Sequence, residues 1–262
     1  MFTVRELAQP ESIEEAYVKL SSDPSNVLLA GCAYLRLGNK KIDVAVDLDS
    51  LNLDFVTEET DLVEIGAMTT LRELETNPVL RKNFSGILPR SVEHIIGVQF
   101  RSSATVGAPV FSRYGFSDPL TALLALETSV ELFNGGRLPL ADFLVKPYSK
   151  DILIKIIIQK DGRQASFQGF RNAASDYSLL NAAVSHLDGK WKVAVGARPM
   201  AAQIAVKTSA AMSGGSLSAE EAGAMAADEL AFGSNAKASG EYRKALCKIL
   251  VARAVREVSQ CR

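Results

Sequence analysis

The sequence is poor in the residues that build metal sites and disulfide frameworks. Its 262 residues include three cysteines, Cys32, Cys247 and Cys261, without CxxC spacing, and two histidines, His94 and His186. An odd number of widely spaced cysteines favours neither a disulfide framework nor a zinc or iron–sulfur site. Both histidines lie in apolar helix or strand patterns, and no GxSxG motif occurs, so we predict structural histidines and no catalytic triad. Any cofactor chemistry must come from an organic group held by backbone and loops.

Excess charge and long apolar runs are lacking as well. Lys plus Arg number 29 and Asp plus Glu number 30, which gives a formal net charge of −1. Such a chain has no field that attracts a nucleic-acid backbone or an anionic membrane. The N-terminus, MFTVRELAQPESIEE, lacks a basic segment followed by an apolar one, and no later stretch holds about eighteen uncharged apolar residues in a row. We therefore expect a cytoplasmic protein with neither nucleic acid nor a membrane as a partner.

What the sequence does contain is typical of a globular α+β protein. It is 47% hydrophobic and 23% charged, which is enough to bury a core. Helix and strand patterns follow one another without a repeated period, and they divide into three parts. The first part, residues 1–52, is predicted to be a small α/β unit. A capping-box spacing at Ser12–Glu15 predicts a helix over about 12–22, and short apolar runs predict strands over 27–30 and 42–48.

The second part, residues 53–160, is predicted to be a larger mixed α+β unit. Ser117-Asp118-Pro119 is typical of a helix start, because Ser117 can cap the first turn and Pro119 is tolerated within it. The other predicted elements are a hairpin over 54–65, helices over 70–77 and 89–97, and strands over 104–107, 130–133 and 152–158.

The third part, residues 161–262, is predicted to be a C-terminal domain of a three-stranded antiparallel sheet with helices. The expected strands are 167–170, 178–187 and 191–195, and the expected helices are 219–232 and 240–258. The last helix is expected to bury one stripe of residues, namely Tyr242, Leu246, Ile249, Leu250 and Val255. Arg171 and Asp176, five positions apart, are expected to form a surface ion pair.

Two glycine-containing loops, Leu29–Leu35 and Ala104–Pro109, each follow an apolar run. In such loops backbone amides can point outward at an anion, and glycine permits positive φ and close approach. Neither loop fits GxGxxG or a P-loop. An ordinary strand-to-loop turn explains either loop taken alone, so the residues by themselves leave both interpretations open.

The order of segments along the chain resembles that of the flavin subunit of molybdenum hydroxylases, up to about Val255. That family includes xanthine dehydrogenases and the medium subunit of aerobic carbon monoxide dehydrogenase. The segments that carry the resemblance are LLAGCAYLRL, IDVAVDLDSL, VEIGAMTTLREL, IGVQFRSSATVGAPV, SDPLTALLALETSVEL, LPLADFL, DILIKIII, FRNAASDYSLLNAAV and SGEYRKALCKILVARAV. In the family the first loop usually reads AGGTD, and the second reads AT(I/V)GGN followed by SD near a helix start.

The resemblance implies a two-loop FAD-binding fold, with an FAD-binding region over 1–160 and a C-terminal domain over 161–262. It implies that loop amides cradle the FAD pyrophosphate and that Asp118 accepts a hydrogen bond from the cofactor. It also implies that Ile152 and Phe167 wall one of the cofactor's rings, while Gln168 stands where relatives often have Lys. The implied cofactor-binding residues are Leu29, Ala30, Gly31, Cys32, Ala33, Tyr34, Leu35, Ala104, Thr105, Val106, Gly107, Ala108, Pro109, Asp118, Ile152, Phe167 and Gln168.

The same resemblance implies an oxidoreductase subunit without a catalytic acid or base of its own. Electrons from a molybdopterin subunit would pass through an iron–sulfur subunit to FAD, and then to NAD or another acceptor. The chain lacks metal ligands, so it would not carry out the hydroxylation alone and requires both partner subunits.

The sequence departs from the family pattern inside both loops. Cys32 replaces the second glycine of the first loop, Ala33 and Tyr34 replace its Thr and polar residue, and Ala108-Pro109 replaces Gly-Asn in the second. A left-handed conformation at Cys32 or Ala108 would cost about 1–2 kcal/mol, and Pro109 removes an amide donor. A structural or assembly component with degenerate loops is therefore the alternative, and a stand-alone small-molecule-binding protein is a further one.

Overall fold

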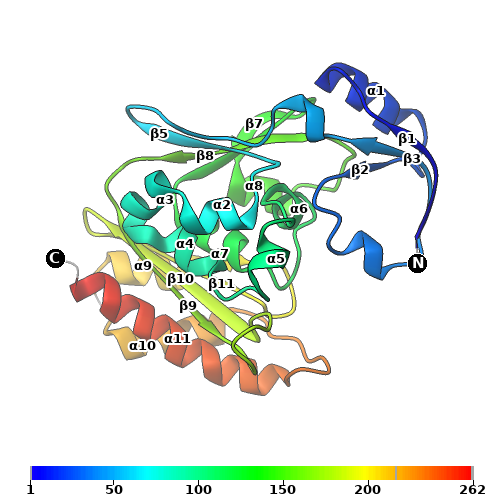
Figure 1. Cartoon of the computed structure of the whole chain (residues 1–262). Helices are drawn as coiled ribbons and strands as arrows, with labels where there is room; N and C mark the ends of the chain where they lie inside the picture. Colours follow the sequence, from blue (N-terminus) through cyan, green and yellow to red (C-terminus); the bar gives the residue numbers. More distant parts are fainter. Residues whose placement is uncertain (1, 216, 261–262) are drawn as a thin grey trace.

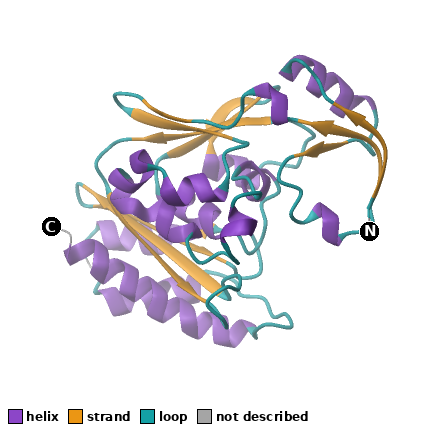
Figure 2. Ribbon diagram, in the orientation of Figure 1, coloured by secondary structure: helices purple, strands orange, loops and turns teal. Residues whose placement is uncertain are grey.

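The computed structural model describes residues 2–215 and 217–260, and Cys261 lies outside them. Three sheets with their helices make up the described chain (Figure 1). In the larger body, the middle sheet, a layer of helices, the C-terminal sheet and a final pair of helices follow one another, while the N-terminal strands lie to one side (Figure 2). The predicted α+β class and the antiparallel C-terminal sheet are confirmed.

The N-terminal unit is a three-stranded parallel sheet with one helix. Its elements are β1 (Thr3–Ala8), α1 (Ile13–Ser22), β2 (Val27–Leu29) and β3 (Lys41–Asp47), in the strand order β1-β3-β2. Strand β1 was not among the predicted elements because it is an edge strand exposed at all but its last residue, so TVRELA carries no burial pattern. Ala16 and Leu20 of α1 pack with Val46 of β3 and with Ile152 of the middle unit, which joins the two units through a shared core.

The middle unit is an antiparallel sheet in the order β4-β5-β8-β6-β7, covered by short helices. Its strands are β4 (Val56–Glu58), β5 (Leu62–Gly66), β6 (Thr128–Leu132), β7 (Gly136–Pro139) and β8 (Leu153–Gln159). Its α-helices are α2 (Leu71–Thr76), α3 (Pro78–Lys82), α4 (Ile87–Val92), α5 (Val98–Arg101), α6 (Gly107–Phe111), α7 (Asp118–Ala125) and α8 (Leu140–Val145). The cap predicted at Ser117 is confirmed, since its side chain accepts a hydrogen bond from the Leu120 amide.

Two predictions for the middle unit are wrong. The strand expected over 104–107 is only an isolated bridge between Thr105 and Thr70, because α6 begins at Gly107 and turns the chain away. The helix expected over 89–97 is α4, which begins earlier and ends at Val92. Ile96 takes a left-handed φ of 52°, which the helix cannot continue through.

The C-terminal unit has four strands rather than the predicted three. Its elements are β9 (Gln164–Phe170), β10 (Leu180–Leu187), β11 (Lys190–Gly196), β12 (Gln203–Ile204), α9 (Val206–Ser213), α10 (Ala219–Glu229) and α11 (Gly240–Gln260). The extra strand β12 is two residues long, too short to leave a period-2 pattern in the sequence. Alternate residues of this sheet face opposite sides: Phe167 and Ala183 pack in the core of the middle unit, whereas Ala182 and Val184 pack with α10 and α11.

The stripe predicted for the last helix is wrong at two of its five positions. Tyr242 and Ile249 of α11 are exposed, whereas Arg243 is buried. Arg243 donates to the carbonyls of Leu179, Gly233 and Ala238, so its buried guanidinium has hydrogen-bond partners. The spacing of apolar residues alone predicts that this charged side chain is exposed.

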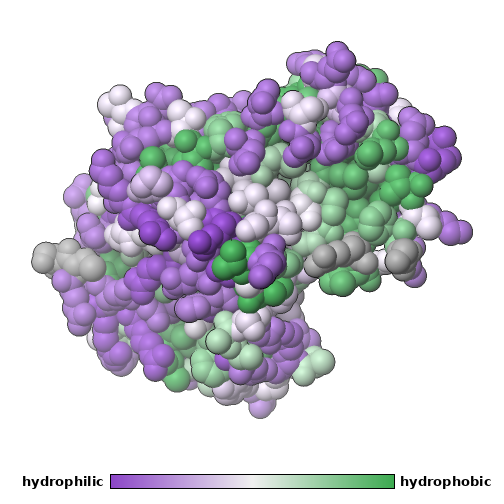
Figure 3. Space-filling model, viewed as in Figure 1, coloured by the Kyte–Doolittle hydropathy of each residue, from purple (hydrophilic) through white to green (hydrophobic). Residues whose placement is uncertain are grey.

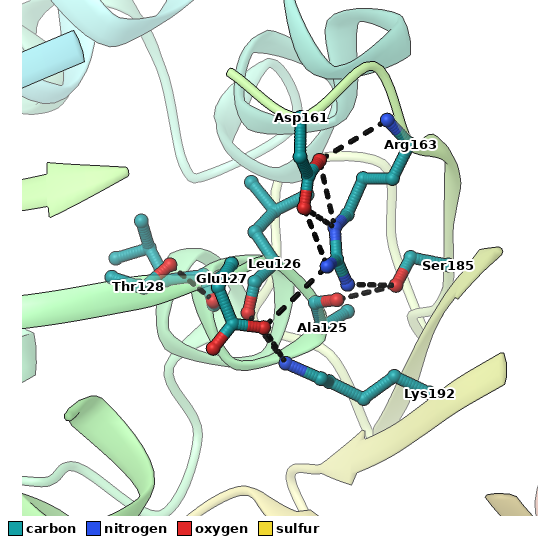
Figure 4. Close-up of polar contacts among 9 residues, drawn as sticks. Ala125, Leu126, Glu127, Thr128, Asp161, Arg163, Ser185 and Lys192 are labelled. Atoms are coloured by element: carbon teal, nitrogen blue, oxygen red, sulfur yellow. Dashed lines mark hydrogen bonds and ion pairs between the residues drawn. The ribbon is translucent and has the colours of Figure 1, made fainter. Parts of the chain in front are cut away.

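A polar cluster joins the middle unit to the C-terminal sheet (Figure 4). Glu127, between α7 and β6, accepts from Lys192 of β11 at 3.0 Å and pairs with Arg163, which precedes β9, at 3.4 Å. The Ser185 hydroxyl of β10 donates to the last carbonyl of α7. These bonds lie where α7 packs on the C-terminal sheet, so the two units are held by polar as well as apolar contacts.

The three sheets fall within residues 3–47, 56–159 and 164–204. The domain boundaries given above, after residues 52 and 160, stay predictions. Among the described residues, we find no helix that is both long and apolar enough to cross a membrane.

Candidate functional site

A cavity of about 570 Å³ lies where the three units meet. Cys32 and Tyr34 reach it from the N-terminal unit, Thr105 and Phe116 from the middle unit, and Tyr177 from the C-terminal unit. Apolar residues gather on the N-terminal strands along one side of the hollowed face seen in Figure 3. A pocket of this size with many apolar and few polar groups is typical of a cofactor site.

The first wall of the cavity is the loop that follows β2. Within the described chain, the amides of Gly31, Cys32, Ala33 and Tyr34 have no hydrogen-bond acceptor. Cys32 has a φ of 51°, in the left-handed region, and its thiol donates to the Ala30 carbonyl at 2.9 Å. Burial raises the pKa of the Cys32 thiol, so this side chain is a neutral part of the wall. Ala108, the other position where strain was considered, lies in α6 without a positive φ.

Replacing Cys32 by glycine is expected to raise the free energy of unfolding by up to about 1.6 kcal/mol. The substitution relieves about 1–2 kcal/mol of left-handed strain and loses about 0.4–1 kcal/mol through the greater freedom of the unfolded chain. Urea unfolding measures the difference. Ala33→Gly is the matched control, because Ala33 has no positive φ and should lose about 0.4–1 kcal/mol. Equal losses in both variants would contradict the assignment of strain to Cys32.

The second wall is the loop that leads into α6, and it packs directly against the first. A Cβ at Gly31 would lie 1.6 Å from the Ser103 carbonyl oxygen, and a Cβ at Gly107 would lie 2.5 Å from that of Ala67. Both glycines are therefore required by close backbone packing, in addition to any ligand they approach. Thr105, 4% exposed, lines the cavity, and its hydroxyl has no partner among the described residues. An unpartnered buried hydroxyl at a cavity wall fits a polar ligand.

Asp118 lies at the start of α7 and is wholly buried. Its carboxylate accepts from Arg171 at 2.6 Å and from the Asn181 side chain. Both oxygens are thus engaged by the C-terminal unit, although Asp118 also belongs to the cavity lining. The surface pair expected between Arg171 and Asp176 is wrong, because Arg171 reaches Asp118 while Asp176 pairs with Lys237.

The structure brings together most of the sequence-predicted site residues, but not all of them. The following line the cavity: Ala30, Gly31, Cys32, Ala33, Tyr34, Leu35, Ala104, Thr105, Gly107, Ala108, Pro109 and Asp118. Ile152 and Phe167 lie in apolar cores and are not among the residues that line the cavity. Gln168 donates to Glu257 of α11, away from the cavity. Leu29 and Val106 also lie outside the cavity lining.

The sequence reasoning missed an aromatic part of the cavity. Phe100, Tyr114, Phe116 and Tyr177 surround Tyr34 there. The run Tyr114-Gly115-Phe116, just before the predicted helix start at Ser117, was the available signal.

Comparison with known proteins decides the family. The family described as the FAD binding domain in molybdopterin dehydrogenase matches residues 2–160, which is more than half of the chain. The chain belongs to this family. The CO dehydrogenase flavoprotein C-terminal domain matches residues 165–258, so the second match begins shortly after the first ends. The resemblance inferred from segment order is confirmed, and so is FAD as the cofactor.

One relative and two solved structures cover nearly the whole chain. The nicotine 6-hydroxylase medium subunit of Paenarthrobacter nicotinovorans is 28% identical over 271 aligned positions, covering 95% of each chain. The fold is that of quinoline 2-oxidoreductase from Pseudomonas putida 86, with a TM-score of 0.86 at 21% identity, over 98% of this chain and 97% of that one. CO dehydrogenase from Oligotropha carboxidovorans superposes with a TM-score of 0.86 at 22% identity, over 97% and 96%.

Proposed function

We propose that this chain is the FAD-carrying subunit of a molybdenum hydroxylase-type complex, in which electrons arrive from an iron–sulfur subunit and leave to NAD or another acceptor. The observation that carries the proposal is the cavity between the two glycine loops, with free amides on one wall and the unpartnered Thr105 hydroxyl on the other. FAD, when bound, supplies the ability to take up and release electrons. The nicotine 6-hydroxylase medium subunit, by its name one part of a larger enzyme, supports the assembly.

The chain's own residues bind and orient the cofactor in this proposal. The amides of Gly31 to Tyr34 donate to pyrophosphate oxygens, which backbone N–H groups bind well. Thr105 donates its hydroxyl to the same polar part of the cofactor. Asp118 is a positioning residue that holds the segment after β9, rather than an acceptor for the cofactor.

The experiment is a titration of the purified chain with FAD, followed by quenching of flavin fluorescence. Thr105→Val keeps the shape of the side chain and removes the hydroxyl. It is expected to weaken FAD binding about 3- to 10-fold, the effect of one hydrogen bond, without lowering stability, because no partner within the chain is lost.

Thr128→Val is the matched control, since the Thr128 hydroxyl is also buried but donates to the Leu123 carbonyl at 2.7 Å, outside the cavity lining. This variant should lose about 1 kcal/mol of stability and leave the FAD affinity unchanged. A chain that takes up no FAD would overturn the proposal. It would favour a structural or assembly component, which the departures at Cys32, Tyr34 and Pro109 also allow.

Purification of the chain from its native source is expected to recover an iron–sulfur and a molybdopterin subunit with it. The physical reason is that the chain supplies a cofactor cavity, while its described residues contain no group of three or more metal-binding side chains. Mass spectrometry and metal analysis of the purified complex measure the result. Recovery of the chain alone, with full oxidoreductase activity, would contradict the proposed partners. The cytoplasmic location stays a prediction.

A further inference from the structure

Five aromatic rings meet inside the cavity, and Tyr34 is at their centre. Its ring centroid lies 5.1 Å from that of Tyr114, 5.4 Å from Phe116, 6.1 Å from Tyr177 and 6.3 Å from Phe100. All four distances are within the range of favourable ring pairs. Tyr114 and Phe116 are themselves stacked, with ring centroids 5.2 Å apart and an interplanar angle of 15°, while the Tyr34 ring meets Tyr114 at 69° and Phe116 at 54°.

A hydrogen bond holds the Tyr34 ring in this position. Its hydroxyl is bonded to the hydroxyl of Tyr177, which lies 143 positions further along the chain. Burial raises the pKa of both tyrosines, so both hydroxyls stay protonated and the bond is one between neutral groups. The bond therefore joins the first loop to the C-terminal unit across the cavity.

Tyr34 thus combines two features within one residue. Its amide belongs to the set of free donors on the first loop, while its ring fills the aromatic part of the same cavity. A ligand that carries both phosphates and a flat ring would use the amides and would also require a place among the rings. The ring of Tyr34 already occupies that place.

Building on the proposed function, we propose that in the empty protein the Tyr34 ring lies in the part of the cavity where a ring of FAD binds. A flat ring of the dinucleotide enters by displacing the Tyr34 ring from its place beside the stacked rings of Tyr114 and Phe116, and this displacement breaks the Tyr34–Tyr177 hydrogen bond. The closed pair thereby sets the affinity and the rate of FAD uptake.

The test is FAD binding to the full chain carrying Tyr34→Phe, Tyr177→Phe or both, with affinity from fluorescence quenching and rates from stopped flow. Each single variant keeps its ring and loses the bond that opposes entry. Each is expected to bind FAD about 3- to 10-fold more tightly than the parent chain, the shift given by one ordinary hydrogen bond. The double variant is expected to match either single variant, because all three lose the same bond.

Tyr242→Phe is the matched control, because Tyr242 of α11 lies outside the cavity lining and its hydroxyl forms no hydrogen bond to the described residues. Its affinity should equal that of the parent chain. If the parent chain binds FAD but Tyr34→Phe binds equally or more weakly, this inference is wrong and the proposed function stands. If the parent chain and every variant fail to take up FAD, the proposed function fails and this inference fails with it.

Discussion

Asp118→Ala is expected to lower the free energy of unfolding by about 3–5 kcal/mol, because it leaves the buried guanidinium of Arg171 without its counter-charge. The Arg171 side chain is 9% exposed, so water cannot replace the lost carboxylate. The Asn181 side chain, which donates to the same carboxylate, also loses its acceptor. Chemical denaturation with the parent chain alongside measures the loss.

Two further variants show whether the effect comes from a buried ion pair. Asp118→Ala combined with Arg171→Ala should be far less damaging than the sum of the single changes, since the double variant leaves neither charge unpaired. Asp228→Ala, which removes the exposed partner of Lys244, should lose no more than about 1 kcal/mol. Unchanged stability of Asp118→Ala together with weakened FAD binding would instead show that the carboxylate serves the cofactor.

Gly31→Ala is expected to disrupt the cavity more than any other single change in its loops. The added methyl would lie 1.6 Å from the Ser103 carbonyl oxygen and 3.0 Å from the Ala104 Cα, so the clash is with backbone. The two loops must separate, and overpacking of this kind costs about 1–3 kcal/mol or more. If that strain falls on the bound state, FAD affinity drops about 5- to 150-fold. Fluorescence titration and urea unfolding measure the two effects.

Gly38→Ala provides the comparison within the same segment. A Cβ there would meet nothing closer than the Leu35 carbonyl oxygen at 3.5 Å, and Gly38 has a φ of −95°. This variant should be neutral or slightly more stable than the parent. Parent-like stability and FAD affinity in Gly31→Ala would mean that the loops do not pack as the structure has them.

Local chemistry made much of the fold predictable. Ser12 and Ser117 were each expected to cap a helix, and each accepts a hydrogen bond from an amide three residues later. These caps depend only on neighbouring residues, so their spacing is visible in the sequence. The two loops could be placed by the same reasoning, because each follows an apolar run and contains a glycine that close packing requires.

Contacts between distant segments were not predictable in this way. Arg171 was assigned to Asp176 because the two are close in sequence, but the fold brings Arg171 to Asp118, 53 positions away. Phe167 was placed beside the cofactor, whereas strand alternation turns its ring into the core of the middle unit. The aromatic cluster around Tyr34 likewise combines separate segments, and no spacing along one of them indicates the others.

Because residues of all three units line one cavity, a ligand bound there contacts every unit and stabilises the contacts between them. A ligand that binds only the assembled cavity stabilises the folded chain by mass action, by about 2.7 kcal/mol at a hundred times its dissociation constant. Apart from the cavity, the N-terminal unit is attached to the rest by a small shared core and by Lys150, which donates to the Leu20 and Asp23 carbonyls. It is therefore the part we expect to open first in the empty protein. Limited proteolysis is therefore expected to cut the N-terminal unit faster in the empty protein than in the FAD-bound protein.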